Sequence, residues 1–375
     1  MSAGSKTPKA HDWINTLAPY VAGKASVDGV ARAVKLSANE SSFGPSPKAI
    51  AAYKEAAETL HRYPDPASAD LAGAIAEVYD LNADKIICGA GSDEVLSLLI
   101  HCFAGPGDEI IHSEYGFSFY PVQAQAFGVT SVAVPNKNWG ADIDGILAAV
   151  TENTKLVFID NPNNPTGAYT PWDEIERLHA GLPPHVILVL DAAYGECVDR
   201  LDYQAGAALV DRADNVIMTR TFSKLYALAA LRVGWGYGSP AILDPMHRVR
   251  MPLNVNRPAQ AAAAAAVRDQ AHLQAAVDYN KQGRDWMQAE LTSMGLDVVP
   301  SETNFLLVGF PKGQDEMGKT VAEQAYDFVA QQGYILRYLP GQGLPDHIRI
   351  TIGTTQDNNS VVALLREFLN GHDHG

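Results

Sequence analysis

One lysine of this chain stands in a setting that could support covalent chemistry. Lys224 lies in the middle of Thr219–Trp235, which reads TRTFSKLYALAALRVGW. Ser223 directly precedes it, and Arg232 follows eight residues later. A lysine amine forms a Schiff base when its pKa is lowered or its ammonium is held beside a carbonyl group. A nearby hydroxyl and guanidinium could bind phosphate, because arginine grips a phosphate group through a planar fork.

Pyridoxal phosphate (PLP) joins these two properties in one ligand. Its aldehyde condenses with a lysine amine, and its phosphate is an anion that needs donors. Most lysines of folded proteins are exposed to solvent, so a surface lysine explains this segment equally well. Whether Lys224 is a PLP-binding lysine or a surface lysine therefore depends on the helices and strands that would position it.

Residues 67–240 alternate between helical and strand patterns. Amphipathic segments such as Asp93–Phe103 and Pro171–Ala180 separate short apolar runs. This alternation predicts a mostly parallel sheet covered by helices on both faces, with ligands beyond the carboxyl ends of the strands. The predicted strands are Lys85–Cys88, Glu109–His112, Ser131–Val134, Leu156–Asp160, Val186–Asp191, Val216–Thr219 and Val233–Tyr237.

Polar and aromatic residues follow several of these strands. Gly91 and Ser92 open a helix, whose N-terminus offers N–H donors to a phosphate. Asn164 lies in a turn made rigid by two prolines, which on its own is an ordinary turn. Asp191 ends a strand, where an acid is often only a helix cap, and Tyr194 follows it.

PLP would use each of these groups. Its pyridine nitrogen stays protonated beside a carboxylate such as Asp191. Its ring oxygen accepts hydrogen bonds, for which Tyr194 and Asn164 are candidates. Its ring face favours a stacked aromatic side chain, and Tyr115 follows the second predicted strand.

Beyond residue 240 the pattern changes to that of a second, smaller α+β domain. A strong helix former begins at Arg257 and is expected to continue to about Leu291. Arg337 and Arg349 alternate with isoleucines on later strands, which indicates either a solvated edge strand or an anion site. The predicted elements are strands near Asp297–Val299, Asn304–Val308, Tyr334–Arg337 and His347–Thr351, and helices near Thr320–Gln332 and from Gln356.

Composition limits the possible partners. The 375 residues carry a formal net charge of -15, so nucleic acid and anionic membranes are not expected to bind. No 18-residue apolar span and no signal-like N-terminus is seen, and no metal site is expected. The three cysteines share no metal-binding spacing, which indicates a reduced, cytoplasmic protein.

Taken together, the motifs resemble those of the fold-type I PLP-dependent aminotransferases, and within them the histidinol-phosphate aminotransferase family. They occur in the family's order along nearly the whole chain. Residues 192, 114 and 225–226 depart from the family's usual residues without removing a catalytic group. The motifs are Tyr63-Pro-Asp-Pro, Gly89-Ala-Gly-Ser-Asp-Glu94, Asn161-Pro-Asn-Asn-Pro-Thr-Gly167, Asp191-Ala-Ala-Tyr194, Thr221-Phe-Ser-Lys224, Leu231-Arg-Val-Gly234 and Ile348-Arg-Ile-Thr-Ile-Gly353.

The resemblance implies roles for individual residues. Lys224 would form the internal aldimine and move the substrate proton, with Asp191 on the pyridine nitrogen. Tyr194 and Asn164 would bond the ring oxygen, and Tyr115 would stack on the ring. The phosphate would be held by Gly91, Ser92, Thr221, Ser223, Arg232 and, from a second subunit of a homodimer, Tyr63. The substrate side would be lined by Tyr20, Asn39, Arg337 and Arg349.

The resemblance also implies an activity and a division of the chain. The activity is ping-pong transamination between histidinol phosphate and 2-oxoglutarate, a step of histidine biosynthesis. The alternatives are an aromatic amino acid aminotransferase using Tyr20, Tyr115 and Tyr338, a PLP-dependent decarboxylase or lyase, and a PLP-binding regulator without activity. The expected parts are an N-terminal arm over residues 1–35, a large PLP-binding domain over 36–262 and a small domain over 263–375.

Overall fold

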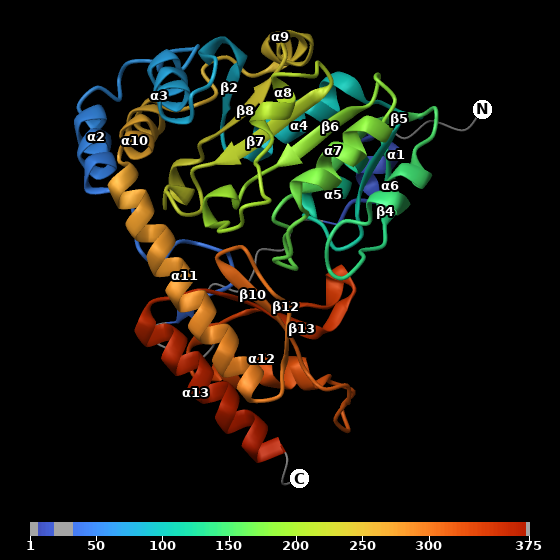
Figure 1. Cartoon of the computed structure of the whole chain (residues 1–375), viewed down its shortest axis with the longest axis vertical. Helices are drawn as coiled ribbons and strands as arrows, with labels where there is room; N and C mark the ends of the chain where they lie inside the picture. Colours follow the sequence, from blue (N-terminus) through green and yellow to red (C-terminus); the bar gives the residue numbers. More distant parts are fainter. Residues whose placement is uncertain (1–6, 19–32, 373–375) are drawn as a thin grey trace.

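A seven-stranded sheet forms the centre of the larger part of the molecule (Figure 1). The computed structural model describes residues 7–18 and 33–372. The strand order is β2-β8-β7-β6-β5-β3-β4, and β8 alone runs antiparallel to its neighbours. All seven predicted strands are confirmed, as β2 (Ile86–Gly89), β3 (Glu109–Ser113), β4 (Thr130–Val134), β5 (Thr154–Asp160), β6 (Ile187–Asp191), β7 (Val216–Thr221) and β8 (Gly234–Gly238).

Helices cover both faces of this sheet, because the central strands are apolar on both sides. In β5, Val157 and Ile159 enter one core while Leu156 and Phe158 enter the other. One face is covered by α4 (Ser92–Phe103), α5 (Phe119–Ala126) and α9 (Pro240–Val249). The opposite face is covered by α3 (Ala69–Tyr79), α6 (Ile143–Ala149), α7 (Trp172–Gly181), α8 (Ala207–Val210) and α10 (Arg257–Arg268).

The smaller part is built on an antiparallel sheet of order β12-β13-β10-β9. Its apolar face packs on three helices, α11 (Gln270–Ser293), α12 (Val321–Gln331) and α13 (Thr355–His372). The predicted second α+β unit is therefore present. Its strands are β9 (Asp297–Val298), β10 (Phe305–Gly309), β12 (Arg337–Leu339) and β13 (Leu344–Thr351), with a separate parallel pair of β1 (Val34–Lys35) and β11 (Tyr334–Ile335).

The single helix expected over Arg257–Leu291 is wrong, because the chain breaks into α10 and α11 at Asp269. Asp269 has φ −91° and ψ 61°, outside the helical region. Its carboxylate accepts hydrogen bonds from Ser46 Oγ at 2.5 Å and Lys48 Nζ at 2.9 Å, at the start of α2 (Pro47–Ala57). These long-range bonds outweigh the local helix propensity. The predicted domain boundary after residue 262 falls inside α10, which packs on α2 and α3.

The remaining elements are short. Among the described residues, no helix is long and apolar enough to cross a membrane. Tyr20, which was predicted to line the substrate side, lies outside the described residues. The short elements are α1 (Asp12–Asn15) and the 3₁₀ turns η1 (Ala83–Lys85), η2 (Gly195–Cys197), η3 (Ala229–Leu231) and η4 (Pro340–Gln342).

Candidate active site

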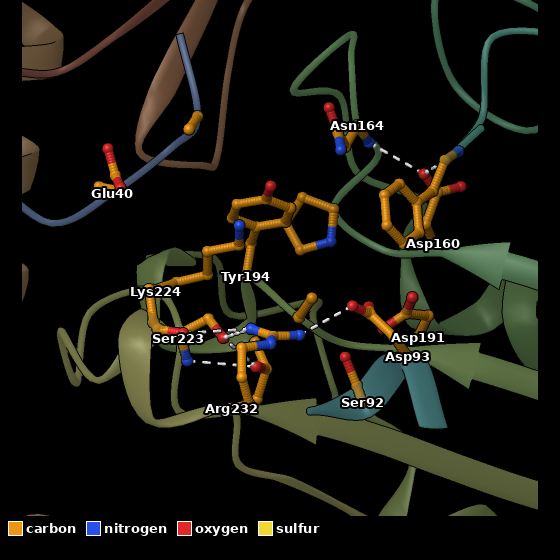
Figure 2. Close-up of a pocket in the computed structure, with 16 residues that line it drawn as sticks. Glu40, Ser92, Asp93, Asp160, Asn164, Asp191, Tyr194, Ser223, Lys224 and Arg232 are labelled. Carbon is orange, nitrogen blue, oxygen red and sulfur yellow. Dashed lines mark hydrogen bonds and ion pairs between the residues drawn. The ribbon is translucent and has the colours of Figure 1, made fainter. Parts of the chain in front are cut away.

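A cavity of about 240 Å³ lies at the carboxyl ends of β5, β6 and β7 (Figure 2). These strands are adjacent and parallel, so the residues at their ends meet at one edge of the sheet. The sequence-predicted residues that line the cavity are Ser92, Asn164, Asp191, Tyr194, Thr221, Ser223, Lys224 and Arg232. Residues far apart in the sequence are thus brought together as predicted.

Asp191 is a buried acid at the end of β6. Its carboxylate accepts hydrogen bonds from the Tyr120 hydroxyl at 2.8 Å and from Thr219 Oγ1 at 3.0 Å. Burial raises its pKa to about 6, and the two hydrogen bonds act in the opposite direction. A cationic partner in the cavity would relieve the cost of burying this carboxylate. The protonated nitrogen of a pyridine ring is such a partner.

Lys224 enters the same cavity from the turn after β7. Its ammonium nitrogen lies 5.3 Å from the centre of the Tyr194 ring, and Figure 2 shows the two side chains side by side. In the described part of the chain, no carboxylate forms an ion pair with Lys224. The predicted surface alternative for Lys224 is therefore excluded, because its side chain lines the same cavity as Asp191.

A cradle for an anion is formed where β7, β8 and α4 meet. Thr221 Oγ1 donates to Ser223 Oγ at 3.0 Å, and Ser223 Oγ accepts from Arg232 Nη1 at 3.2 Å. Gly91 has φ +85°, and a Cβ on it would collide with the Arg232 guanidinium. Among the described side chains none caps the first turn of α4, so its N–H groups are available.

The cradle suits a phosphate group. Arg232 now pairs with Asp93 through a 2.8 Å contact between partly exposed side chains, so an entering phosphate would compete with a weak ion pair. The cavity therefore offers an amine, a buried acid and an anion cradle, which are the groups that PLP requires. The residues present fit this cofactor.

Asn164 and Arg349 join the two parts of the molecule at the cavity. Asn164 Oδ1 accepts from Arg349 Nη1 at 2.5 Å, and the Asn164 N–H donates to Asp160 Oδ2 at 2.9 Å. Arg349 lies on β13, an inner strand of the small sheet, and only 8% of it is exposed. Burial lowers its pKa to about 10. The solvated-edge interpretation of Arg349 is therefore wrong.

A second cavity of about 280 Å³ adjoins the first on the side of the small sheet. Tyr194, Asn164 and Lys224 line it, which connects the two cavities. Asn39 belongs to it, and its side-chain amide donates to the Tyr194 hydroxyl at 2.8 Å. The substrate-side residues Asn39, Arg337 and Arg349 are brought together here, with Lys35, Ser118 and Gln342.

Tyr115 does not lie where the sequence predicted. Its ring packs 6.0 Å from the Trp139 ring, against Leu339 and Leu344 of the small sheet. Phe117 lines both cavities instead. The reason is the turn after β3, in which the Tyr115 N–H is fixed by Asn136 Oδ1 at 2.8 Å. The aromatic ring available for stacking is therefore that of Phe117.

Tyr63 lies on the surface of this chain, away from both cavities. Its side chain is 82% exposed, in a hollow formed by residues 60–64 and 252–258. So large an exposed aromatic side chain is compatible with a contact to another subunit. The predicted role of Tyr63 across a dimer interface stays a prediction.

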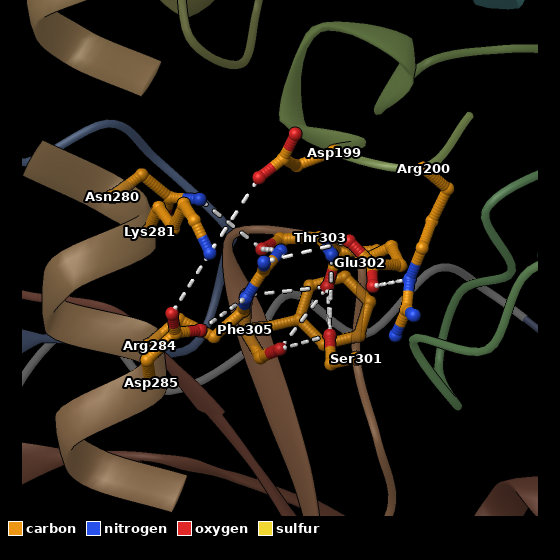
Figure 3. Close-up of polar contacts among 10 residues, drawn as sticks. All are labelled: Asp199, Arg200, Asn280, Lys281, Arg284, Asp285, Ser301, Glu302, Thr303 and Phe305. Carbon is orange, nitrogen blue, oxygen red and sulfur yellow. Dashed lines mark hydrogen bonds and ion pairs between the residues drawn. The ribbon is translucent and has the colours of Figure 1, made fainter. Parts of the chain in front are cut away.

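An ion-pair cluster behind the site holds the two parts of the molecule together (Figure 3). Glu302 accepts from Arg200 Nε at 2.6 Å and from Arg284 Nη2 at 3.4 Å. The Glu302 N–H donates to the carbonyl of Gly167, at the end of the Asn164 turn. Phe305, on the strand that follows, packs edge-on against the Tyr194 ring at 5.3 Å. The cluster therefore fixes the elements that carry Asn164 and Tyr194.

Sequence reasoning missed several residues of the site. Asp160 ends β5 as Asp191 ends β6, so its position was a usable indication. Asp160 accepts the N–H groups of Asn164 and Phe117, and burial raises its pKa well above the usual range. The other missed residues are Lys35, Glu40, Asp93, Phe117 and Tyr120.

Comparison with known proteins agrees with this geometry. Residues 31–365 match the model of the family described as aminotransferase class I and II. The histidinol-phosphate aminotransferase of Rhodopseudomonas palustris (strain BisB18) is 50% identical over 363 residues, which cover 96% of this chain and 98% of the relative. That of Nitrobacter winogradskyi (strain Nb-255) is 48% identical over 363 residues, again 96% and 98% of the two chains.

A solved structure is also similar. The histidinol-phosphate aminotransferase from Sinorhizobium meliloti in complex with pyridoxal-5'-phosphate has a TM-score of 0.88 and 30% identity, covering 99% of both chains. The fold is thus that of the fold-type I PLP-dependent transferases, as predicted. The chain belongs to the aminotransferase class I and II family, and the motif resemblance is confirmed.

Proposed function

We propose that this protein is a PLP-dependent aminotransferase that moves the amino group of histidinol phosphate to 2-oxoglutarate. The observation that carries this proposal is that Lys224, the buried Asp191 and the anion cradle around Arg232 line one cavity. The relatives at up to 50% identity, named histidinol-phosphate aminotransferase, support the substrate.

The chain's own residues divide the work. PLP, when bound, supplies an aldehyde that takes the amino group and a ring that accepts electrons. Asp191 keeps the proton on the ring nitrogen, and Tyr194 with Asn164 orients the ring oxygen. The Lys224 amine would take the proton from the substrate carbon and deliver it to the carbon of the cofactor's aldehyde group, as general base and then acid. Arg232, Ser223, Thr221 and the start of α4 hold the phosphate.

The second cavity favours an anionic substrate over a purely aromatic one. Arg337 and Arg349 lie in register on β12 and β13, which places two guanidinium groups on the same sheet. Of the rings on which the aromatic alternative depends, Tyr115 packs on Trp139 and Tyr338 on Tyr326. Tyr338 also hydrogen-bonds Thr320 Oγ1 at 3.2 Å. The described residues therefore give the aromatic alternative no support.

A panel of amino donors tests the proposed function. Purified holoenzyme is mixed with histidinol phosphate, glutamate, phenylalanine or tyrosine under single-turnover conditions, and the visible band of the bound cofactor is followed. We expect histidinol phosphate and glutamate to bleach the band and 2-oxoglutarate to restore it. Bleaching by phenylalanine alone would contradict the substrate, and product release without any oxo acid would indicate a lyase or decarboxylase.

A homodimer with Tyr63 reaching the neighbouring site is supported by the exposure of that ring. A cytoplasmic location is supported by the unpaired Cys88, Cys102 and Cys197. We propose a three-part division of the chain as predicted, but with the boundary between the large and small domains moved from residue 262 to the break between α10 and α11 at Asp269.

A further inference from the structure

The second cavity is unusual in its charge. Its described lining contains the cations Lys35, Lys224, Arg337 and Arg349, and no carboxylate among those lining residues. The whole chain carries a net charge of -15, so this collection of cations opposes the global field. A local excess of positive charge of this size fits a ligand with more than one negative charge.

One arginine of this cavity, Arg349, is held by hydrogen bonds. Arg349 uses Nη1 on Asn164 and donates from Nη2 to the Ser37 carbonyl at 2.8 Å. Arg337 lies opposite it in the sheet, and its charge contributes to lowering the pKa of Arg349. Two guanidinium groups offer enough donors for the two oxygens of a carboxylate, whereas a phosphate monoester has three acceptor oxygens and can use a further cation.

Lys35 differs from Arg349 because its side chain is 39% exposed and loosely held. It lies on β1, opposite Ile335 of β11 and two residues from Arg337 in that register. Its ammonium is 3.6 Å from Glu40 Oε1, a half-exposed carboxylate. Such a pair is worth about 0–1 kcal/mol, so an anion in the cavity can displace Glu40 from the lysine.

Glu40 faces the other cavity. It lines the first cavity and not the second one. Lys35 therefore lies between Glu40 on one side and the two arginines on the other. A substrate dianion in the second cavity would draw the Lys35 ammonium toward Arg337 and Arg349. A single carboxylate would draw it about half as strongly, because Coulomb attraction scales with charge.

We propose, building on the function proposed above, that Lys35 is a third cation of the substrate phosphate site and that Glu40 holds it when the site is empty. The pair then determines specificity, because it favours a phosphate monoester, with about −1.5 to −2 charges at pH 7, over a carboxylate. Lys35 contacts only the distal anion, and the chemistry at the amino group is unaffected by it.

The test uses four variants of the holoenzyme and two kinds of donor. Lys35→Gln should raise KM for histidinol phosphate roughly two- to fivefold and leave kcat unchanged, since one partly exposed charge contact is lost. KM for glutamate, the donor whose side-chain carboxylate carries a single charge, should stay within about twofold. Lys35→Arg should restore KM, Glu40→Gln should lower it, and the exposed Lys312→Gln serves as the matched charge control.

Inorganic phosphate, used as a competitive inhibitor, separates this inference from the proposed function. Its inhibition constant should rise in Lys35→Gln and fall in Glu40→Gln, whichever donor the wild-type enzyme turns over. Wild-type enzyme that ignores histidinol phosphate would overturn the proposed substrate, and the phosphate constants would still decide on Lys35. Equal changes in KM for histidinol phosphate and for glutamate, or an unchanged phosphate constant in Lys35→Gln, would overturn the role of Lys35.

Discussion

The side-chain amide of Asn39 donates a 2.8 Å hydrogen bond to the hydroxyl of Tyr194. Asn39 is itself held by Thr351 of β13, through its N–H at 3.0 Å and its Oδ1 at 3.1 Å. The segment after β1, the turn after β6 and the small sheet therefore meet at one phenol. This phenol is oriented before any ligand enters the site.

Tyr194→Phe should lower both stability and activity. The change leaves the buried Asn39 amide without its acceptor, which costs about 1–3 kcal/mol in the free energy of unfolding. Loss of one hydrogen bond to the cofactor ring should lower kcat/KM by roughly tenfold or more. Denaturant unfolding and steady-state kinetics measure the two effects. Tyr237→Phe, which removes a bond to Asp211 far from the site, should leave kcat/KM unchanged.

Phe117 and Tyr115 offer a matched pair of aromatic variants. Phe117→Leu should weaken PLP binding by roughly two- to tenfold, since aromatic stacking is worth about 0.5–1.5 kcal/mol. Tyr115→Leu should leave PLP affinity unchanged, because its ring packs on Trp139 and the small sheet. Equilibrium titration of the apoenzyme with PLP gives both constants. The reverse order of effects would restore the role that the sequence predicted for Tyr115.

The difference between these two residues shows where sequence reasoning ends. The strands were predictable because the central ones are apolar on both faces, and Asp191, Asn164 and Lys224 could be placed because they follow strands. Both aromatic residues follow β3, so their order along the chain could not separate them. The turn is decided by contacts made at long range, such as that of Asn136 with the Tyr115 N–H.

Long-range polar contacts also explain the other differences between the predicted and the observed structure. Helix propensity alone predicts a continuous helix through Asp269, and only the contacts with Ser46 and Lys48, 223 and 221 residues away, break it. The partners of Glu302 are 102 and 18 residues distant and carry no local pattern. Ion pairs of this kind form only when the fold brings distant residues together, so they cannot be predicted from the local sequence.

Asp191 makes the stability of the PLP-free protein depend on pH. Its folded pKa of about 6 lies above the unfolded value, so the folded state binds the proton more tightly. The stability contributed by the protonated acid is full below about pH 4 and is lost as the pH rises to about 6. Asp191→Asn should therefore gain stability relative to wild type over this interval, reaching about 3 kcal/mol above pH 6.

Denaturant unfolding of both proteins at pH 4 to 7 measures this difference. Bound PLP should reduce it, because a cationic ring nitrogen stabilises the carboxylate. A difference in the free energy of unfolding that stays constant across this range would contradict a raised pKa for Asp191. The same holds if wild type becomes more stable relative to Asp191→Asn as the pH rises.

Glu302→Gln should destabilise the protein strongly. Only 4% of the Arg284 side chain and 8% of that of Glu302 are exposed, so the variant leaves the buried guanidinium with only the more exposed Asp285, 3.6 Å from its Nε. The expected cost is about 3–5 kcal/mol in the free energy of unfolding. Glu290→Gln is the control, since its pair with Arg366 is partly exposed and should be worth less than about 1 kcal/mol. Equal losses in the free energy of unfolding would show that the buried ion pairs of Glu302 stabilise the protein no more than the partly exposed pair of Glu290.

The covalent role of Lys224 is tested most directly by borohydride reduction of the PLP-loaded protein, followed by peptide mass spectrometry. We predict that the reduced cofactor is found on the peptide that contains Lys224, and that Lys224→Ala carries no attached cofactor and loses transamination. Cofactor attached to a different lysine, or a fully active Lys224→Ala variant, would contradict the assignment of this amine as the reacting group.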